Sequence, residues 1–194
     1  MLTRLLHIAG IILCVTFLLG ANQCQTSTTN GTGSDGPVFV TTLAVEDANG
    51  NSVSTFLSTT NIQFVLGIRN RSTSNQTIAF SMGQQYNFEV LQSGTATEVW
   101  TWALDQSQPF SQNSSSLTIK AGQTQTFSVI WNQLDDNGQQ VLAGSYEVIG
   151  GLTCTNSSSS SSSASIACMP TGISTSDQLA PSVFISTLVP FTIQ

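Results

Sequence analysis

The stretch Glu98-Val99-Trp100-Thr101-Trp102 holds two of the three tryptophans in this chain of 194 residues. Side chains two residues apart in an extended strand point to the same face, so we expect Trp100 and Trp102 to share a face with Glu98. Only 7% of the residues are charged. A chain so poor in charge, and rich in Ser, Thr, Asn, Gln and Gly, needs large aromatic anchors for its core. The stretch therefore predicts a strand that supplies two of them.

Runs of alternating apolar and polar residues continue this pattern in both directions along the chain. In residues 62–70 the side chains of Ile62, Phe64, Leu66 and Ile68 fall on one face, as in a strand buried on one side. Turn-forming Gly, Asn and Asp separate the runs. Short strands at fairly regular spacing, without an amphipathic helix, predict an all-β sandwich or barrel. The expected strands are Val38–Glu46, Ile62–Asn70, Thr77–Ser81, Tyr86–Leu91, Glu98–Leu104, Leu117–Lys120, Thr126–Trp131, Gly144–Thr153 and Val183–Ile193.

The N-terminal segment, residues 1–23, has the features of a secretory signal peptide. Arg4 precedes an apolar run, residues 8–19, that is shorter than the roughly 20 residues a membrane-spanning helix needs. Residues 24–37 are mostly Thr, Asn, Gly and Ser and predict a flexible polar linker. We expect one β-sandwich domain over residues 38–194, without a transmembrane helix. The expected location is extracytoplasmic, either secreted or anchored at the bacterial cell envelope.

The cysteines are interpreted in the same compartment. Cys154 and Cys168 flank an uninterrupted serine run, residues 157–163. We expect this run to form an exposed loop closed by a disulfide between the two cysteines. In the chain-entropy model such a bridge stabilises the fold by roughly 3 kcal/mol. Cys24 would be the unpaired thiol, and the sequence leaves open whether it is lipidated or the chain is freely secreted.

The balance of charge excludes some classes of partner. The sequence has a pI of about 4.2, and beyond the expected signal peptide its only basic residues are Arg69, Arg71 and Lys120. Nucleic acids and anionic membrane surfaces are bound by clustered Lys and Arg. Neither is an expected partner.

Catalytic residues are hard to find in the sequence. The sole histidine, His7, lies in the expected signal peptide, so nucleophile–histidine systems and His/Cys zinc sites are not expected. The carboxylate pairs Glu98 with Asp105 and Asp135 with Asp136 have no partner that the sequence identifies. We therefore predict that the chain is not an enzyme and has no catalytic, cofactor-binding or metal-binding residues.

Two features allow alternative interpretations. Asp47–Asn51 places oxygen atoms at alternate positions, as some calcium loops do, but a hairpin turn needs no ion. The same choice applies to 135–138. Trp100 and Trp102, with Trp131, either form an exposed aromatic surface for sugars or pack in the core, which is the preferred interpretation.

Several segments between Phe64 and Leu152 follow the order seen in one known family. The segments are Leu66-Gly67-Ile68-Arg69-Asn70-Arg71-Ser72, Ile78-Ala79-Phe80-Ser81, Gly83-Gln84-Gln85-Tyr86-Asn87-Phe88-Glu89-Val90, Glu98-Val99-Trp100-Thr101-Trp102 followed by Phe110, Ile119-Lys120-Ala121-Gly122-Gln123, Phe127 to Trp131, and Ala143-Gly144-Ser145-Tyr146-Glu147-Val148. On these motifs the chain resembles the bacterial intracellular proteinase inhibitor family, or BsuPI-like domain. The resemblance implies an immunoglobulin-like antiparallel β-sandwich that inhibits a proteinase.

The chain also departs from this family. Asn87 stands where the family tends to have Asp, the expected signal peptide conflicts with an intracellular role, and the serine-rich loop is an addition. No inhibitory residue can be carried over from the family. The preferred function is an exported, non-catalytic domain that binds a protein, namely a proteinase. The alternatives are a structural or adhesive surface domain without an enzyme target and a carbohydrate-binding module. The oligomeric state is not predicted.

Overall fold

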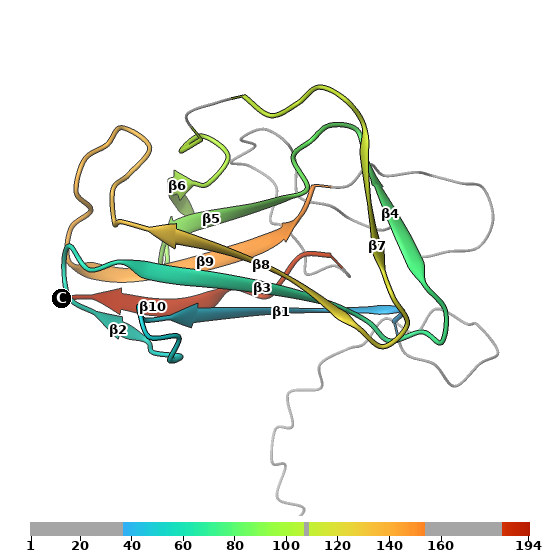
Figure 1. The fold of residues 1–194 in the computed structure, drawn as a ribbon. Coiled ribbons are helices and arrows are strands. Elements are labelled where there is room, and N and C mark those ends of the chain that lie inside the picture. Colours follow the sequence, from blue (N-terminus) through green and yellow to red (C-terminus); the bar gives the residue numbers. More distant parts are fainter. Residues whose placement is uncertain (1–36, 107–108, 154–183) are drawn as a thin grey trace, which may run out of the picture. The chain divides into compact units, whose positions relative to one another are not determined.

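Short strands make up the regular structure in the computed structural model, which describes residues 37–106, 109–153 and 184–194. Within these residues the chain forms ten strands (Figure 1). The same residues include no helix long and apolar enough to cross a membrane. The strands are β1 (Phe39–Glu46), β2 (Thr55–Phe56), β3 (Ile62–Asn70), β4 (Gln76–Phe80), β5 (Tyr86–Gln92), β6 (Thr97–Thr101), β7 (Ser115–Ile119), β8 (Thr124–Trp131), β9 (Gly144–Leu152) and β10 (Val189–Ile193).

Two sheets face each other across the core, and a separate strand pair extends from them. In the first sheet β3 lies between β1 and β8 and is antiparallel to both. The second sheet has the order β2-β10-β9-β5-β6 and is antiparallel except for the short contact of β2 with β10. β4 pairs with β7. The predicted all-β, immunoglobulin-like antiparallel sandwich is confirmed.

The core lies between the two sheets and is centred on Phe64 of β3. Alternation places this side chain on the inner face, where it is fully buried. The centroid of its ring lies 6.2 Å from those of Phe88 and Trp100, 6.0 Å from that of Trp131 and 5.9 Å from that of Phe191. These four rings come from β5, β6, β8 and β10. One side chain of the first sheet therefore contacts three strands of the second.

A β-bulge at Val99 interrupts the pairing of β6 with β5. Trp100 pairs with Val90, but Glu98 pairs with Leu91, so Val99 has no partner on β5. Paired residues face the same side of a sheet. The extra residue therefore turns Glu98 to the outer face while Trp100 faces the core. The prediction that these two side chains share a face is wrong, because simple alternation does not hold across a bulge.

This strand also ends earlier than expected, at Thr101 instead of Leu104. The backbone N–H of Leu104 donates to the carbonyl of Thr101 at 3.1 Å, which turns the chain. Trp102 lies just past the strand end. Its half-buried ring stacks on Tyr86 at 4.4 Å and packs against Phe110 at 5.3 Å.

Two smaller differences concern the second sheet. β2 was not predicted, because two residues show no period. The last strand was expected from Val183, but it begins at Val189. In the described residues before it, Ile185 forms an isolated bridge with Gly151.

We predict that Phe64→Ala lowers the free energy of unfolding by about 3–5 kcal/mol, because it removes a ring that both sheets contact. Urea unfolding followed by tryptophan fluorescence measures the loss. Ile130→Ala is the matched control, since Ile130 is an exposed apolar residue on β8. A loss for Phe64→Ala no larger than that of the control would contradict the central role of this ring.

Candidate functional site

The loop between β8 and β9, residues 132–143, is held by hydrogen bonds from the neighbouring strands and from residues 57–60. It lies beside the turn between β2 and β3, at the left of Figure 1, where C marks the position of Gln194. The Ser58 N–H and hydroxyl both donate to the carbonyl of Gln194, each at 2.8 Å. We call residues 57–60 and 132–143, with Gln194, the loop end.

Gln133 joins the two segments of the loop end. Its side chain is fully buried, and its Nε2 donates to the carbonyls of Leu57 at 2.9 Å and Thr60 at 2.8 Å. Its Oε1 accepts a hydrogen bond from the N–H of Thr59 at 3.0 Å. Gln133 and Thr59 have φ values of 63° and 69°, a region that non-glycine residues rarely adopt. Such backbone strain persists only where the surroundings fix it, and it is frequent at functional sites.

Two core side chains, Trp131 and Tyr146, also donate hydrogen bonds to the backbone of this loop. Trp131 Nε1 donates to the carbonyl of Leu134 at 2.7 Å, and Tyr146 Oη donates to the carbonyl of Leu142 at 2.6 Å. The N–H of Val141 donates to the carbonyl of Gln133 at 3.0 Å. The loop is therefore fixed at both of its ends, and the bond between Val141 and Gln133 joins these ends to each other.

Two turns of the same sequence pattern have the same hydrogen bonds. Asp47 Oδ1 accepts from the N–H groups of Asn49 and Asn51 at 2.8 and 2.9 Å. Asp135 Oδ1 accepts from those of Asn137 and Gln139 at 2.9 and 2.8 Å. These carboxylates serve as internal acceptors of the turns. Among the described residues, no group of three or more His, Cys, Asp or Glu is placed to hold a metal ion.

Asp136 connects the loop to β6. Its Oδ1 accepts a hydrogen bond from the N–H of Thr101 at 2.9 Å, and its own N–H donates to the carbonyl of Val99 at 3.1 Å. The bulged Val99 thus finds its backbone partner in the loop instead of in β5. The bulge and the loop depend on each other.

Three carboxyl groups meet on the outer face beside this connection. They come from Glu89 of β5, Glu98 of β6 and Asp136 of the loop. Asn87 Nδ2 donates to Glu89 Oε1 at 3.4 Å and lies 3.0 Å from Thr101 Oγ1. We call Glu89, Glu98 and Asp136 the acidic cluster.

The acidic cluster favours protonated carboxyl groups. Glu89 is 9% exposed, and burial, followed by the charges of Glu98 and Asp136, raises its pKa to about 7, against the lowering effect of the Asn87 hydrogen bond. Burial and the neighbouring Asp136 also raise the pKa of Glu98. Burial raises the pKa of Asp136 as well, and nearby Asp135 and Asp105 add to this effect. The hydrogen bond between Glu98 and Asp136 favours Glu98 as the protonated donor.

The loop end presents apolar side chains to solvent. Leu142 is 80% exposed and Leu57 is 65% exposed, whereas the neighbouring Val141 is buried. A single exposed leucine is common on protein surfaces. Here two of them stand on segments that are tied together through Gln133.

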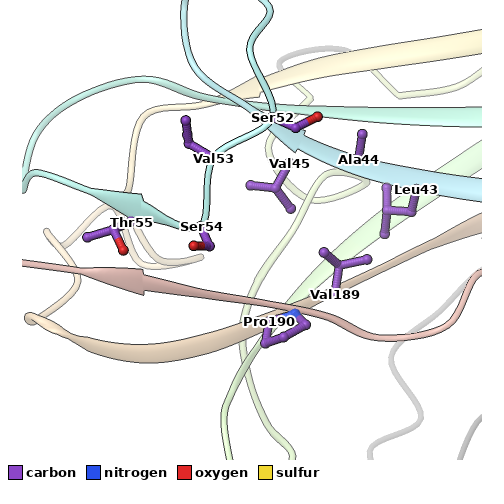
Figure 2. Close-up of a pocket in the computed structure, with 9 residues that line it drawn as sticks. All are labelled: Leu43, Ala44, Val45, Ser52, Val53, Ser54, Thr55, Val189 and Pro190. Atoms are coloured by element: carbon purple, nitrogen blue, oxygen red, sulfur yellow. The ribbon is translucent and has the colours of Figure 1, made fainter.

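A second surface feature is an open recess of about 690 Å³ between β1, residues 52–55 and β10. Figure 2 shows Leu43, Val45 and Val189 pointing toward the space between β1 and β10. No charged side chain lines the recess, so it offers packing but no acid or base. Its lining residues are Leu43, Ala44, Val45, Ser52, Val53, Ser54, Thr55, Val189 and Pro190.

The structure separates some of the predicted site residues and joins others. Trp100 is 2% exposed and lies in the core, as does Trp131, so the exposed pair of Trp100 and Trp102 is not formed. The alternative of core packing holds for Trp100. It pairs with the buried Val90, whereas the next residue of β5 toward the N-terminus, Glu89, points to the outer face of the sheet. Glu98 interacts with Asp136, a pairing that the sequence did not indicate.

Gln133 and Leu142 were missed altogether by sequence reasoning. Gln133 lies in a run of polar residues, where nothing distinguishes a buried amide from an exposed one. The available signal was the apolar pair Val141-Leu142, which follows a turn and precedes β9.

Some predictions concern residues outside those that the structure describes. The signal peptide over residues 1–23, the linker over 24–37 apart from its last residue, and lipidation of Cys24 belong to this group. So do the serine-rich loop and the disulfide between Cys154 and Cys168. They stay predictions.

Comparison with known proteins identifies a family. The family model described as BsuPI, intracellular proteinase inhibitor, matches residues 51–157, which is more than half of the chain and includes both segments of the loop end except Gln194. No curated protein matches the sequence.

Solved structures give only distant similarities. The CARDB domain of a Pyrococcus furiosus protein is 8% identical, with 80% of this chain and 91% of that chain covered and a TM-score of 0.36. A β-glucosidase from Listeria innocua is 8% identical, with coverages of 80% and 16% and a TM-score of 0.38. The alkylpurine DNA glycosylase AlkC of Pseudomonas fluorescens is 8% identical, with coverages of 82% and 31% and a TM-score of 0.40. None of these similarities bears on function.

The family match corrects the predicted location. The matching family is described as intracellular, which points to the cytoplasm, so the predicted extracytoplasmic location is wrong. That prediction rested on Arg4 and the apolar run at residues 8–19, which were interpreted as a secretory signal peptide. Both are features of hydropathy and composition that other roles also produce.

We predict that Gln133→Leu loosens the loop end. The variant leaves the N–H of Thr59 and the carbonyls of Leu57 and Thr60 without this amide, and the expected loss of stability is about 2 kcal/mol. Amide hydrogen exchange should accelerate at Thr59 in particular. Gln139→Leu, at an exposed position of the same loop, is the control and should leave the exchange of Thr59 unchanged.

The acidic cluster predicts a stability that falls as pH rises. Glu89 is neutral in both states below its ordinary pKa of about 4.5, so its contribution is fully present there and is lost as pH rises toward its folded pKa of about 7. The expected loss between these pH values is on the order of 3 kcal/mol. Denaturant unfolding at pH 4.5, 6 and 8 measures it, and Glu89→Gln should flatten the profile.

Asp47→Asn is a control for this pH profile, because the pKa of Asp47 is lowered in the folded chain whereas that of Glu89 is raised. Hydrogen bonds from Asn51 and Asn49 lower the pKa of Asp47, so its contribution is lost as pH falls below about 4. The substitution should alter only that acidic limb. A Glu89→Gln profile parallel to that of the wild type above pH 4.5 would contradict the role given to Glu89.

Proposed function

We propose that this chain, which belongs to the BsuPI intracellular proteinase inhibitor family, binds and blocks a proteinase without being a catalyst itself. The observation that carries the proposal is the family match over residues 51–157. The matched segment contains β2 to β9, and with them the β2–β3 turn and the β8–β9 loop. The partner is therefore a protein.

We place the contact with the proteinase at the loop end. A loop that is already ordered loses little conformational entropy when it binds, so more of the contact energy appears as affinity. Gln133, Tyr146 and Trp131 supply that order through the hydrogen bonds described above.

A non-catalytic role is supported by the chemistry of the described side chains. They include no histidine, and the carboxyl groups of the acidic cluster are engaged with Asn87 and with one another. The burial of Trp100 removes half of the aromatic surface that a sugar-binding role requires. A structural or adhesive role also fits the low charge and the Ser/Thr-rich composition, and it becomes the interpretation if inhibition is not found.

The experiment is an inhibition assay of the full chain against serine, cysteine and metalloproteinases with small chromogenic substrates. We expect dose-dependent inhibition of at least one enzyme, with a Ki in the micromolar range or below. Gln133→Leu should raise this Ki about tenfold, because a loosened loop must be ordered at a cost of about 1.4 kcal/mol. Absence of inhibition across all three classes would refute the proposed function.

A further inference from the structure

We propose that Leu142 is the side chain that enters the specificity pocket of the inhibited proteinase, and that this pocket is apolar. The inference rests on the proposed function and adds to it the residue that makes the central contact and the chemistry of the site that receives it.

The first argument is the way in which the backbone presents Leu142. Its side chain is 80% exposed, the largest exposure among the large apolar residues of the described chain. Its carbonyl accepts the hydrogen bond from Tyr146 Oη at 2.6 Å. On the other side, Val141 is buried, and its N–H is bonded to the carbonyl of Gln133. An exposed side chain between two fixed points can enter a pocket without prior ordering of its backbone.

The second argument is the shape of the chain after Leu142. Ala143, Gly144 and Ser145 follow, and none of them has a side chain longer than two heavy atoms. Ala143 is exposed, so the backbone directly after Leu142 can approach the rim of a cleft closely. Gly144 and Ser145 already belong to β9, where they pair with Ile193 and Thr192 and anchor this end of the loop. Central, well-packed anchors of this kind carry most of the energy at protein interfaces.

Leu57 is the competing anchor at the loop end. Its carbonyl accepts hydrogen bonds from Gln133 Nε2, the N–H of Thr60 and the hydroxyl of Thr60, so it begins a tight turn. A tight turn presents its side chain beside a folded-back backbone, which fits the rim of a cleft better than a deep pocket. We therefore assign Leu57 to the periphery of the contact.

The apolar character of the pocket follows from the residues of the loop end. Neither 57–60 nor 132–143 contains Lys or Arg, so the segments cannot neutralise an acidic group at the base of a pocket. A buried, unpaired carboxylate facing leucine would be strongly unfavourable. An apolar slot, such as that of chymotrypsin, accepts leucine, whereas trypsin has an acidic pocket that selects basic side chains.

The test is a change of specificity at one position. Wild type, Leu142→Lys and Leu188→Lys are assayed against chymotrypsin and trypsin, and thermal unfolding of each variant verifies that it folds. Leu188 is 46% exposed and lies next to the start of β10, which pairs with β9 at Val148, roughly 20 Å along the strand from Leu142. It is a matched control because the same Leu→Lys change is made far from the loop end.

We expect the wild type to inhibit chymotrypsin and not trypsin. Leu142→Lys should weaken inhibition of chymotrypsin at least 100-fold and create inhibition of trypsin, while Leu188→Lys should behave as the wild type. If the wild type inhibits chymotrypsin and Leu142→Lys does so equally well, the assignment of Leu142 is overturned and the proposed function stands. If the wild type inhibits only trypsin, the apolar pocket is overturned. If it inhibits neither of these nor any other proteinase, both proposals are overturned.

Discussion

The contact of one ring, Phe64, with aromatic side chains of both sheets is the constraint on which the rest of the structure depends. Aromatic pairs at such separations add to the free energy that burial alone supplies. β3 carries this ring near its first residue, so the ring cluster lies beneath the loop end. Trp131, one of its members, ends β8 and donates the hydrogen bond that begins the β8–β9 loop. The shape of the loop end is thus an extension of the packing in the core.

The bulge at Val99 is the second determinant of the surface. It turns Glu98 toward Glu89 and leaves a backbone carbonyl for the N–H of Asp136. Asn87 Nδ2 donates a hydrogen bond to Glu89 Oε1. An ionised Asp could only accept, and its charge would oppose ionisation of Glu89 further. The hydrogen bond from the Asn87 amide therefore offsets part of the cost of ionising the buried carboxyl group of Glu89.

The strands were predictable because alternation is a property of the sequence itself. Residues 62–70 carry the period without interruption, and the predicted and observed strands coincide. β2 was not predictable, because a two-residue strand exists only through its partner β10. The bulge at Val99 and the positive φ of Gln133 arise from contacts between segments distant in sequence, which no local pattern encodes. The family could be identified from motifs in order, whereas the compartment was wrongly inferred from an apolar run near the N-terminus.

The partner of β2 has a consequence for the order in which the molecule is assembled. Thr55 and Phe56 pair with Thr192 and Ile193, and the adjacent turn is tied to the carbonyl of Gln194. During synthesis the N-terminal strands emerge first and must wait for these residues. Without them β2 has no strand to pair with, and the N–H and hydroxyl of Ser58 lack the Gln194 carbonyl. The hydrogen bonds and strand pairing that complete the loop end can therefore form only after β10 has emerged.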